Sequence, residues 1–284
     1  MLDKPIDLTD HLKRLNPRKQ RIKLIGVELE GGWEKLPPGV ALVRDGSIKN
    51  LTKGGALAVE QARYQELSGL ANRGALTHTQ LREYHALHAS LRGGNGTGLH
   101  IGELPSQAMA RGQLANWMRT FYPSHVNETC GMHMHMSFGR PLTYQRLMTP
   151  VYPATVIRHM TRWAQKEALA STHPLWPRLR GESEYCQHVF NADDQVKWTG
   201  GKDYDHHRKG HRYSVVAYRW PTHQTVEIRL LPMFEKWDQA LRAIEEQLNI
   251  TEAFLIATKR REEKVPITVP YDDTSHRETL IDFI

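Results

Sequence analysis

Histidine and methionine alternate in residues 130–138, which read Cys-Gly-Met-His-Met-His-Met-Ser-Phe. In a β-strand, successive side chains point to opposite faces of the sheet. We therefore expect the methionines to face the core and His133, His135 and Ser137 to share the other face. Two neighbouring imidazoles suit a metal or phosphate site. Two solvated histidines on a half-exposed strand would give the same pattern.

A second predicted strand, residues 21–30, carries the carboxylates Glu28 and Glu30 two positions apart. Side chains at this spacing lie on one face, where two carboxylates repel each other unless a cation lies between them. The pair therefore predicts one wall of a divalent-metal site. A solvated polar strand face is the alternative for this segment alone.

A third pair, Glu227 and Arg229, alternates with aliphatic residues in the predicted strand 225–231. Together with residues 212–218 this strand is expected to form a hairpin. If the three polar faces line one cleft, oxygen ligands dominate it and favour Mg²⁺ or Mn²⁺ over a closed zinc site. Arg212 and Arg229 would suit phosphate oxygens through the fork geometry of their guanidinium groups. Such a cleft is what phosphoryl transfer requires.

The remaining pattern predicts helices between these strands. Apolar residues at helical spacing favour helices over residues 58–71, 77–91, 107–121, 150–170 and 237–259. Short strands are expected at residues 40–44 and 99–106, the latter carrying Glu103, and residues 171–211 are expected to be rich in loops. We divide the chain into a basic lead-in at residues 1–20, a single catalytic domain at 21–265 and a C-terminal arm at 266–284.

Composition excludes several classes of protein. Of the 284 residues 39% are hydrophobic and 24% are charged, which argues against long disordered segments. No apolar run reaches the ~20 residues of a membrane helix, and residues 1–20 lack the apolar core of a signal peptide. Two cysteines provide no disulfide framework, so we expect a cytoplasmic protein. The net charge of +7 suits an anionic partner or serves solubility alone.

The motifs in chain order are Gly-Val-Glu-x-Glu, Asp-Gly-Ser, Gly-Glu-x-x-Ser, Gly-Met-His-x-His-x-Ser, Arg-Tyr and Val-Glu-x-Arg. They lie within residues 24–48, 99–106, 130–138 and 211–232. This order resembles the amidoligase family of carboxylate–amine ligases, which is similar to the catalytic half of glutamine synthetase and to glutamate–cysteine ligase. The resemblance implies an α+β fold: a curved, mainly antiparallel sheet backed by helices, with ATP and divalent metals on its concave face.

The resemblance also implies a role for each motif residue. The expected metal ligands are Glu28, Glu30, Glu103, His133 and Glu227. His135 and Ser137 would lie nearer the nucleotide. Arg212 and Arg229 would hold phosphates or the acyl-phosphate, and Asp45 would lie near the amine or substrate end.

The leading hypothesis is therefore an ATP- and Mg²⁺-dependent ligase that joins a carboxylate to an amine through an acyl-phosphate. Its partners would be a nucleotide, a small-molecule or protein carboxylate, and an amine. One alternative is a metal-dependent hydrolase that uses the His-x-His strand. The other is a basic nucleic-acid-binding protein, which leaves the paired carboxylates unexplained because they would repel phosphate. The sequence identifies neither the acid nor the amine, and it leaves a homo-oligomer open.

Overall fold

The computed structural model describes residues 4–16, 20–43, 45, 48, 51, 57–93, 99–139, 143, 146–189, 213–219 and 225–258. Its elements, in chain order, are α1 (Thr9–Lys13), β1 (Ile22–Trp33), α2 (Leu57–Ala71), α3 (His78–Gly93), β2 (His100–Leu104), the 3₁₀ helix η1 (Arg111–Gln113), α4 (Leu114–Phe121), β3 (Gly131–Phe138), α6 (Val151–Lys166), α7 (Leu175–Arg180), β4 (Val216–Arg219), β5 (Thr225–Pro232) and α10 (Trp237–Ala257). This is an α+β structure, and it confirms that class.

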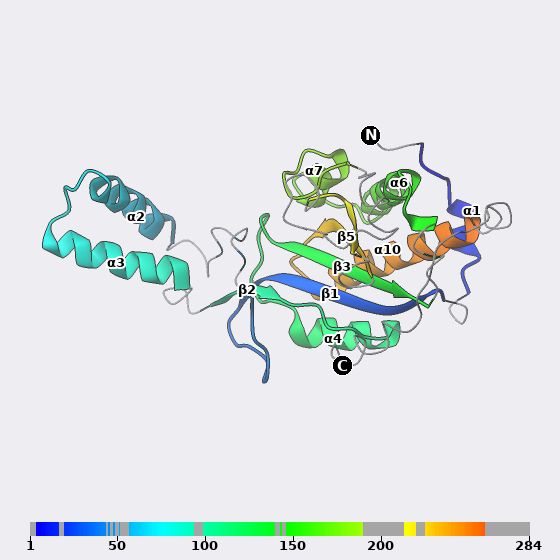
Figure 1. Ribbon diagram of the computed structural model, residues 1–284, viewed down its shortest axis with the longest axis horizontal. Coiled ribbons are helices and arrows are strands. Elements are labelled where there is room, and N and C mark those ends of the chain that lie inside the picture. The colour runs from blue at the N-terminus through cyan, green and yellow to red at the C-terminus, as the bar shows by residue number, and fades with distance from the viewer. Residues whose placement is uncertain are drawn as a thin grey trace, which may run out of the picture.

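Five strands of the described ranges form one sheet in the order β2-β1-β3-β5-β4, and each neighbouring pair is antiparallel (Figure 1). The two central pairs bring distant segments together, because β3 lies between β1 and β5. In this register Glu28 is directly opposite His133, and His135 is directly opposite Glu227. The predicted hairpin is confirmed as the pairing of β4 with β5.

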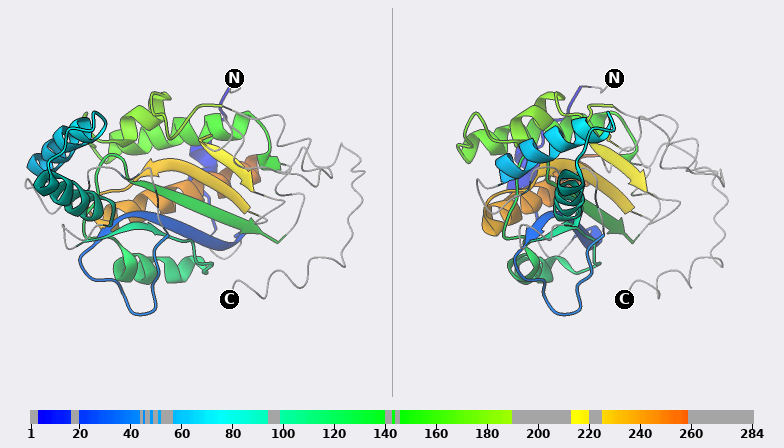
Figure 2. Two further views of the ribbon diagram at one scale, coloured as in Figure 1. Left: turned by 60° about the vertical axis from the view of Figure 1, so that its left-hand side comes forward. Right: turned by 90° about the vertical axis from the view of Figure 1, so that its left-hand side faces the viewer.

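The methionine face of β3 forms the centre of the core. Met132, Met134 and Met136 are fully buried, as their alternation predicts. Helices α4, α6 and α10 pack together behind this face (Figures 1 and 2). Helix α6 presents Tyr152, with Val156 and Met160 following at four-residue steps, and this spacing puts all three on one buried stripe. The tyrosine hydroxyl also forms a buried hydrogen bond with a threonine of α10 at 2.7 Å.

The N-terminal segment is attached to this helical layer. Leu8 is fully buried in the same core, and its N–H donates to His159 Nε2 of α6 at 3.0 Å. Asp7 forms exposed ion pairs with two arginines of the same helix, Arg158 and Arg162. The basic lead-in therefore begins with residues that pack against the body, and α1 contacts α10.

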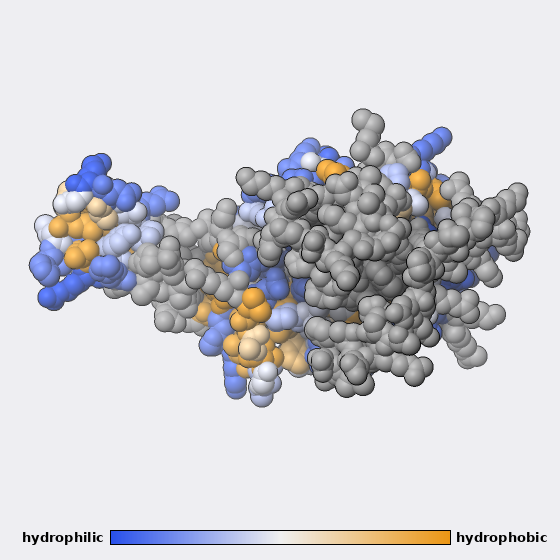
Figure 3. Space-filling model, in the orientation of Figure 1, coloured by the Kyte–Doolittle hydropathy of each residue, from blue (hydrophilic) through white to orange (hydrophobic). Residues whose placement is uncertain are grey.

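Helices α2 and α3 form a hairpin beyond one end of the sheet (Figure 1). Arg63 of α2 bonds to Glu83 of α3 at 2.9 Å, and Tyr64 stacks on Tyr84 with 5.3 Å between ring centroids. Figure 3 shows hydrophobic areas on this hairpin, where Leu81 is exposed, and on the loop that follows β1. Among the described residues no helix combines the length and apolarity that crossing a bilayer requires.

Three predicted elements differ from the structure. In place of a strand at residues 40–44, Val43 makes an isolated bridge to Glu103 within the described ranges. The helix expected at residues 107–121 begins four residues later, as a 3₁₀ turn followed by α4. The loop-rich region at 171–211 contains α7. These differences have one cause, since short elements depend on tertiary contacts that local pattern does not contain.

Candidate metal centre

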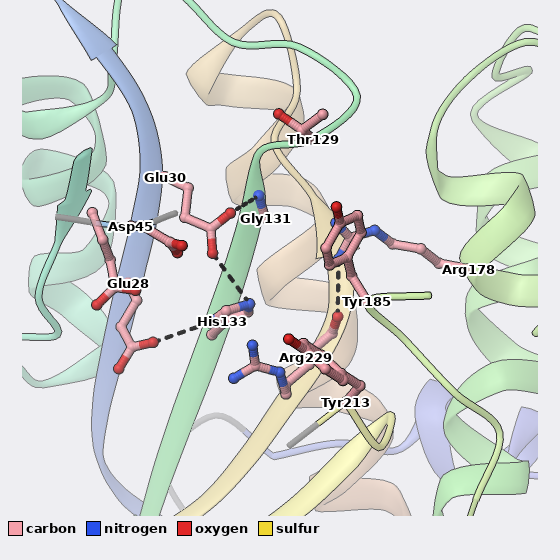
Figure 4. Close-up of a pocket in the computed structure, with 11 residues that line it drawn as sticks. Glu28, Glu30, Asp45, Thr129, Gly131, His133, Arg178, Tyr185, Tyr213 and Arg229 are labelled. Atoms are coloured by element: carbon pink, nitrogen blue, oxygen red, sulfur yellow. Dashed lines mark hydrogen bonds and ion pairs between the residues drawn. The ribbon is translucent and has the colours of Figure 1, made fainter. Parts of the chain in front are cut away.

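A pocket lies on the polar face of the sheet, opposite the buried methionines (Figure 4). Strands β1, β2, β3 and β5 supply most of its floor, and α7 with the segments before β3 and β4 supplies its walls. Residues predicted from the sequence that line it are Glu28, Glu30, Asp45, Glu103, His133 and Arg229. Acidic side chains from segments far apart in the sequence therefore converge, as the sequence pattern predicts.

Glu28, His133 and Glu227, which we call the inner set, lie on the three central strands. Each offers a ligand atom within 4.8 Å of the others. His133 Nδ1 is 3.0 Å from Glu28 Oε2 and 3.9 Å from Glu227 Oε1. His133 and Glu227 are 5% and 2% exposed, so the strand register holds both in fixed positions away from bulk water.

Glu28 contacts both imidazoles on the polar face of the sheet, those of His133 and His135. Its second carboxylate oxygen accepts from His135 Nε2 at 2.9 Å, while the first faces His133. Burial works against the charged form, but the hydrogen bonds from both imidazoles hold the pKa of Glu28 well below its usual range. The carboxylate is therefore ionised at neutral pH and available to a cation.

Glu30, Asp45 and Glu103, which we call the outer set, lie toward the β2 edge of the sheet. Their ligand atoms also lie within 4.8 Å of one another. Burial raises the pKa of Glu30. Burial and the nearby charges of Glu28 and Asp45 raise the pKa of Glu103 to about 7. Like charges crowded in a partly dry site disfavour one another's ionised form.

The two sets adjoin each other at Glu30 and His133. His133 Nε2 lies 3.7 Å from Glu30 Oε1, and Glu30 Oε2 accepts from the Gly131 N–H at 2.5 Å (Figure 4). The polar face thus forms one continuous row of ligands across β2, β1, β3 and β5. A row of this kind can hold two cations side by side.

The residues present fit hard divalent cations. Ligands of one cation with bonds of roughly 2.1–2.6 Å lie no more than about 5 Å apart, and the ligand atoms of each set lie within 4.8 Å of one another. Five carboxylates of the two sets face two guanidinium groups, Arg178 and Arg229, among the described residues. Two of these carboxylates, Glu30 and Glu227, are buried and the other three are half-buried, so an excess of negative charge here requires compensation. Carboxylate oxygens with one imidazole favour Mg²⁺ or Mn²⁺.

Arg229 lies on the same face as the inner set and pairs with Glu227. Burial opposes its charged form, but the Glu227 carboxylate holds the pKa of Arg229 above its usual range. Its Nε atom is buried and has no hydrogen-bond partner within the described part of the chain. The Nε–H donor of Arg229 is therefore not used by these described residues.

Arg178 is a pocket residue that the sequence reasoning missed. It is 3% exposed, and its Nη1 atom donates to the carbonyl oxygens of Arg229 and Leu231, each at 3.1 Å. Burial lowers the pKa of Arg178. Within the described ranges it forms no ion pair. The spacing of Leu175 and Leu179 could have predicted this position, because residues four apart share one face of a helix and Arg178 lies on that same buried face.

Other predicted residues lie outside this pocket or outside the description. His135 and Glu227 occupy the polar face beside this pocket, but neither is part of its lining. Ser137 is not part of it either and instead bonds to the backbone of Leu24. Arg212 falls outside the described residues, so its expected role stays a prediction. The lining also includes Tyr213, the tyrosine of the Arg-Tyr motif, and Tyr185, which was not singled out from the sequence.

Comparisons with known proteins return no match: the chain matches no family model, no curated protein and no solved structure.

Proposed function

We propose that this chain is an ATP- and Mg²⁺-dependent carboxylate–amine ligase that forms an amide through an acyl-phosphate. The observation that carries the proposal is the adjacency of the inner and outer sets on one polar face, with two buried arginines at its border. The order of motifs that resembles the amidoligase family supports the same reading.

The ligand sets suit a pair of divalent cations. Mg²⁺ bound there would supply neutralising charge to phosphate oxygens and fix their orientation. The protein itself fixes the positions and charges of the ligand carboxylates before a cation binds. Glu28 stays ionised through its two imidazole contacts, and Glu30 is fixed by the Gly131 N–H. Preorganised groups cost little reorganisation during the reaction.

Two guanidinium groups would bind the oxygens of the phosphoryl group as it is transferred. Arg229 faces the pocket beside Glu227, and Arg178 holds the strand segment that carries Arg229. Planar guanidinium groups bind phosphate oxygens through paired donors and remain charged at neutral pH. Arginines beside the cation ligands would therefore offset the negative charge that builds up on the phosphoryl group.

The proposed reaction has two steps. A substrate carboxylate oxygen attacks the γ-phosphorus of ATP, the bond to ADP breaks, and an acyl-phosphate forms. An amine nitrogen then attacks the acyl carbon, phosphate leaves with the bonding electrons, and the amine loses a proton as the amide forms. Phosphorylation is needed because it turns a poor leaving group into a good one.

Phosphate release tests this proposal. The protein is incubated with ATP, Mg²⁺ and pooled amino acids and polyamines, and any active pool is resolved into single compounds. With an ¹⁸O-labelled carboxylate substrate, we expect one ¹⁸O atom in the released phosphate. Glu227→Gln should abolish release, whereas the exposed Glu235→Gln should not. Release without ¹⁸O transfer, or release unchanged in Glu227→Gln, would contradict the proposal.

A metal-dependent hydrolase is the second candidate. It is favoured by the mixed nitrogen and oxygen donors of the inner set, which could hold one cation that activates water. Metal analysis of the purified protein separates the two functions. Tightly held zinc or iron, with no affinity for ATP, would favour the hydrolase.

A further inference from the structure

Gly131 lies where the inner and outer sets adjoin. It is the first residue of β3 and shares a strand face with His133, because residues two apart in a strand point the same way. A side chain at position 131 would therefore enter the space above the imidazole. A Cβ atom placed on Gly131 would lie 3.1 Å from His133 Nε2 and 3.2 Å from Glu30 Oε2.

Backbone conformation does not explain a glycine at this position. Gly131 lies in an extended strand and is not among the described glycines with a left-handed φ angle. An alanine could adopt the same backbone without strain. The requirement for glycine is therefore one of space above the strand.

The peptide group of Gly131 makes a second contribution. Its N–H donates to Glu30 Oε2 at 2.5 Å, while Glu30 Oε1 lies 3.7 Å from His133 Nε2 (Figure 4). Glu30 is 4% exposed, so this contact fixes a buried carboxylate. Gly131 therefore affects the Glu30 carboxylate in two ways. Its lack of a side chain leaves space for the carboxylate, and its N–H donates a hydrogen bond to it.

We propose that Gly131 is a positioning residue that lets Glu30 approach His133 closely enough for the two sets to hold neighbouring divalent cations. This inference rests on the proposed function, because it assumes that both sets bind cations. Replacement by alanine would push Glu30 and His133 a few tenths of an ångström from their positions. The outer set would lose affinity first, since Glu30 belongs to it.

The experiment is a Mn²⁺ titration, followed by the electron paramagnetic resonance signal of free Mn²⁺. Wild type should bind two Mn²⁺ ions per chain. Gly131→Ala should weaken one site by about 10- to 100-fold, as loss of a supporting contact to a ligand does. Gly112→Ala is the matched control, because a Cβ atom there has no atom within 4 Å.

A second variant tests whether Gly131 acts through Glu30. Glu30→Gln should weaken the same site, and combining it with Gly131→Ala should add little, since residues that act through one contact are not additive. Wild-type affinities in Gly131→Ala would overturn this inference alone. Failure of wild type to bind Mn²⁺ would overturn the proposed function with it.

Thermal unfolding in EDTA measures the stability of the two glycine variants without a cation. A larger loss of stability in Gly131→Ala than in Gly112→Ala would assign a structural role instead and overturn the inference.

Discussion

The inner and outer sets lie side by side on one sheet, but their charges are balanced in opposite ways. In the inner set, Glu28 bonds to two imidazoles and Glu227 pairs with Arg229. In the outer set, burial and neighbouring carboxylates raise the pKa values of Glu30 and Glu103. Protein contacts therefore already favour the charged forms of the inner-set carboxylates, while the charged forms of Glu30 and Glu103 in the outer set are disfavoured and would be favoured by a bound cation.

Position in the sheet explains this difference. The inner set is built on β1, β3 and β5, whose antiparallel pairing fixes each side chain against its neighbour. The outer set joins β1 to the edge strand β2 and to Asp45 in the loop that follows β1. If both sets bind cations, we expect binding to order the outer set more than the inner set, because Glu103 and Asp45 lie on an edge strand and a loop.

Among the variants that test the contrast between the two sets, Glu28→Gln is expected to have the largest effect, because it removes the carboxylate that both imidazoles contact. An amide cannot accept from both imidazoles with full charge, so the inner set loses its preorganisation. We expect ATP-dependent phosphate release to fall by about 10²–10³-fold, the usual cost of losing a preorganised electrostatic contact.

Glu34→Gln is the matched control, because Glu34 is a surface residue whose side chain is 55% exposed and pairs with His125. This variant should keep the wild-type rate. Equal rates in both variants would show that the inner set has no special role.

An intermediate effect is expected from Arg178→Met, which keeps the aliphatic length of the side chain but removes two hydrogen bonds to β5 carbonyl oxygens. We expect the free energy of unfolding in urea to fall by about 1.5–3 kcal/mol, because buried carbonyl groups lose a charged donor. The inner set would be affected through Arg229, whose segment of β5 these bonds hold.

Arg180→Met serves as the control on the same helix. Arg180 is 53% exposed and pairs with Glu182, an arrangement that contributes no more than about 1 kcal/mol. If both arginine variants lose the same stability, the buried contacts of Arg178 do not support β5.

The smallest effect is expected in the pH dependence of the free energy of unfolding, which arises from Glu103 of the outer set. The pKa of Glu103 is raised to about 7 in the folded protein from an ordinary value of 4.5. A raised carboxyl pKa means that the folded state binds the proton more tightly, so stability is lost as pH rises from 4.5 through 7. Metal-free protein should therefore lose about 1–2 kcal/mol between pH 5 and pH 8, a value reduced for the partial solvation of this group.

Urea unfolding in EDTA at the two pH values measures this loss, and Glu103→Gln should reduce it. Adding Mn²⁺ at pH 8 should restore the stability of wild type, since a cation replaces the proton. A stability that is equal at both pH values, or unchanged by Glu103→Gln, would contradict the contrast between the two sets.

Local pattern predicted the elements that alternate strictly. The methionine and imidazole faces of β3, the acid pair of β1 and the Glu227–Arg229 face of β5 are each a property of one strand, set by its two-residue period. The opposition of Glu28 and His133 depends on register between distant strands, which no single segment encodes.

Helix α7 shows the other limit. Pro174 and Pro177 suggested a loop, but proline is tolerated in a first helical turn, whose N–H groups have no intrahelical partner. Gly181 then ends the helix in a left-handed conformation, with a φ angle of 75°. Missing this six-residue helix meant missing Arg178, because its contacts to β5 are tertiary.

The most direct test of the account is equilibrium binding of ATP with and without Mg²⁺, measured by titration calorimetry on wild type and Glu227→Ala. We predict that wild type binds ATP only when Mg²⁺ is present and that Glu227→Ala loses this binding while remaining folded. ATP binding that ignores Mg²⁺, or that survives unchanged in Glu227→Ala, would contradict the claim that this polar face is a two-cation site for phosphoryl transfer.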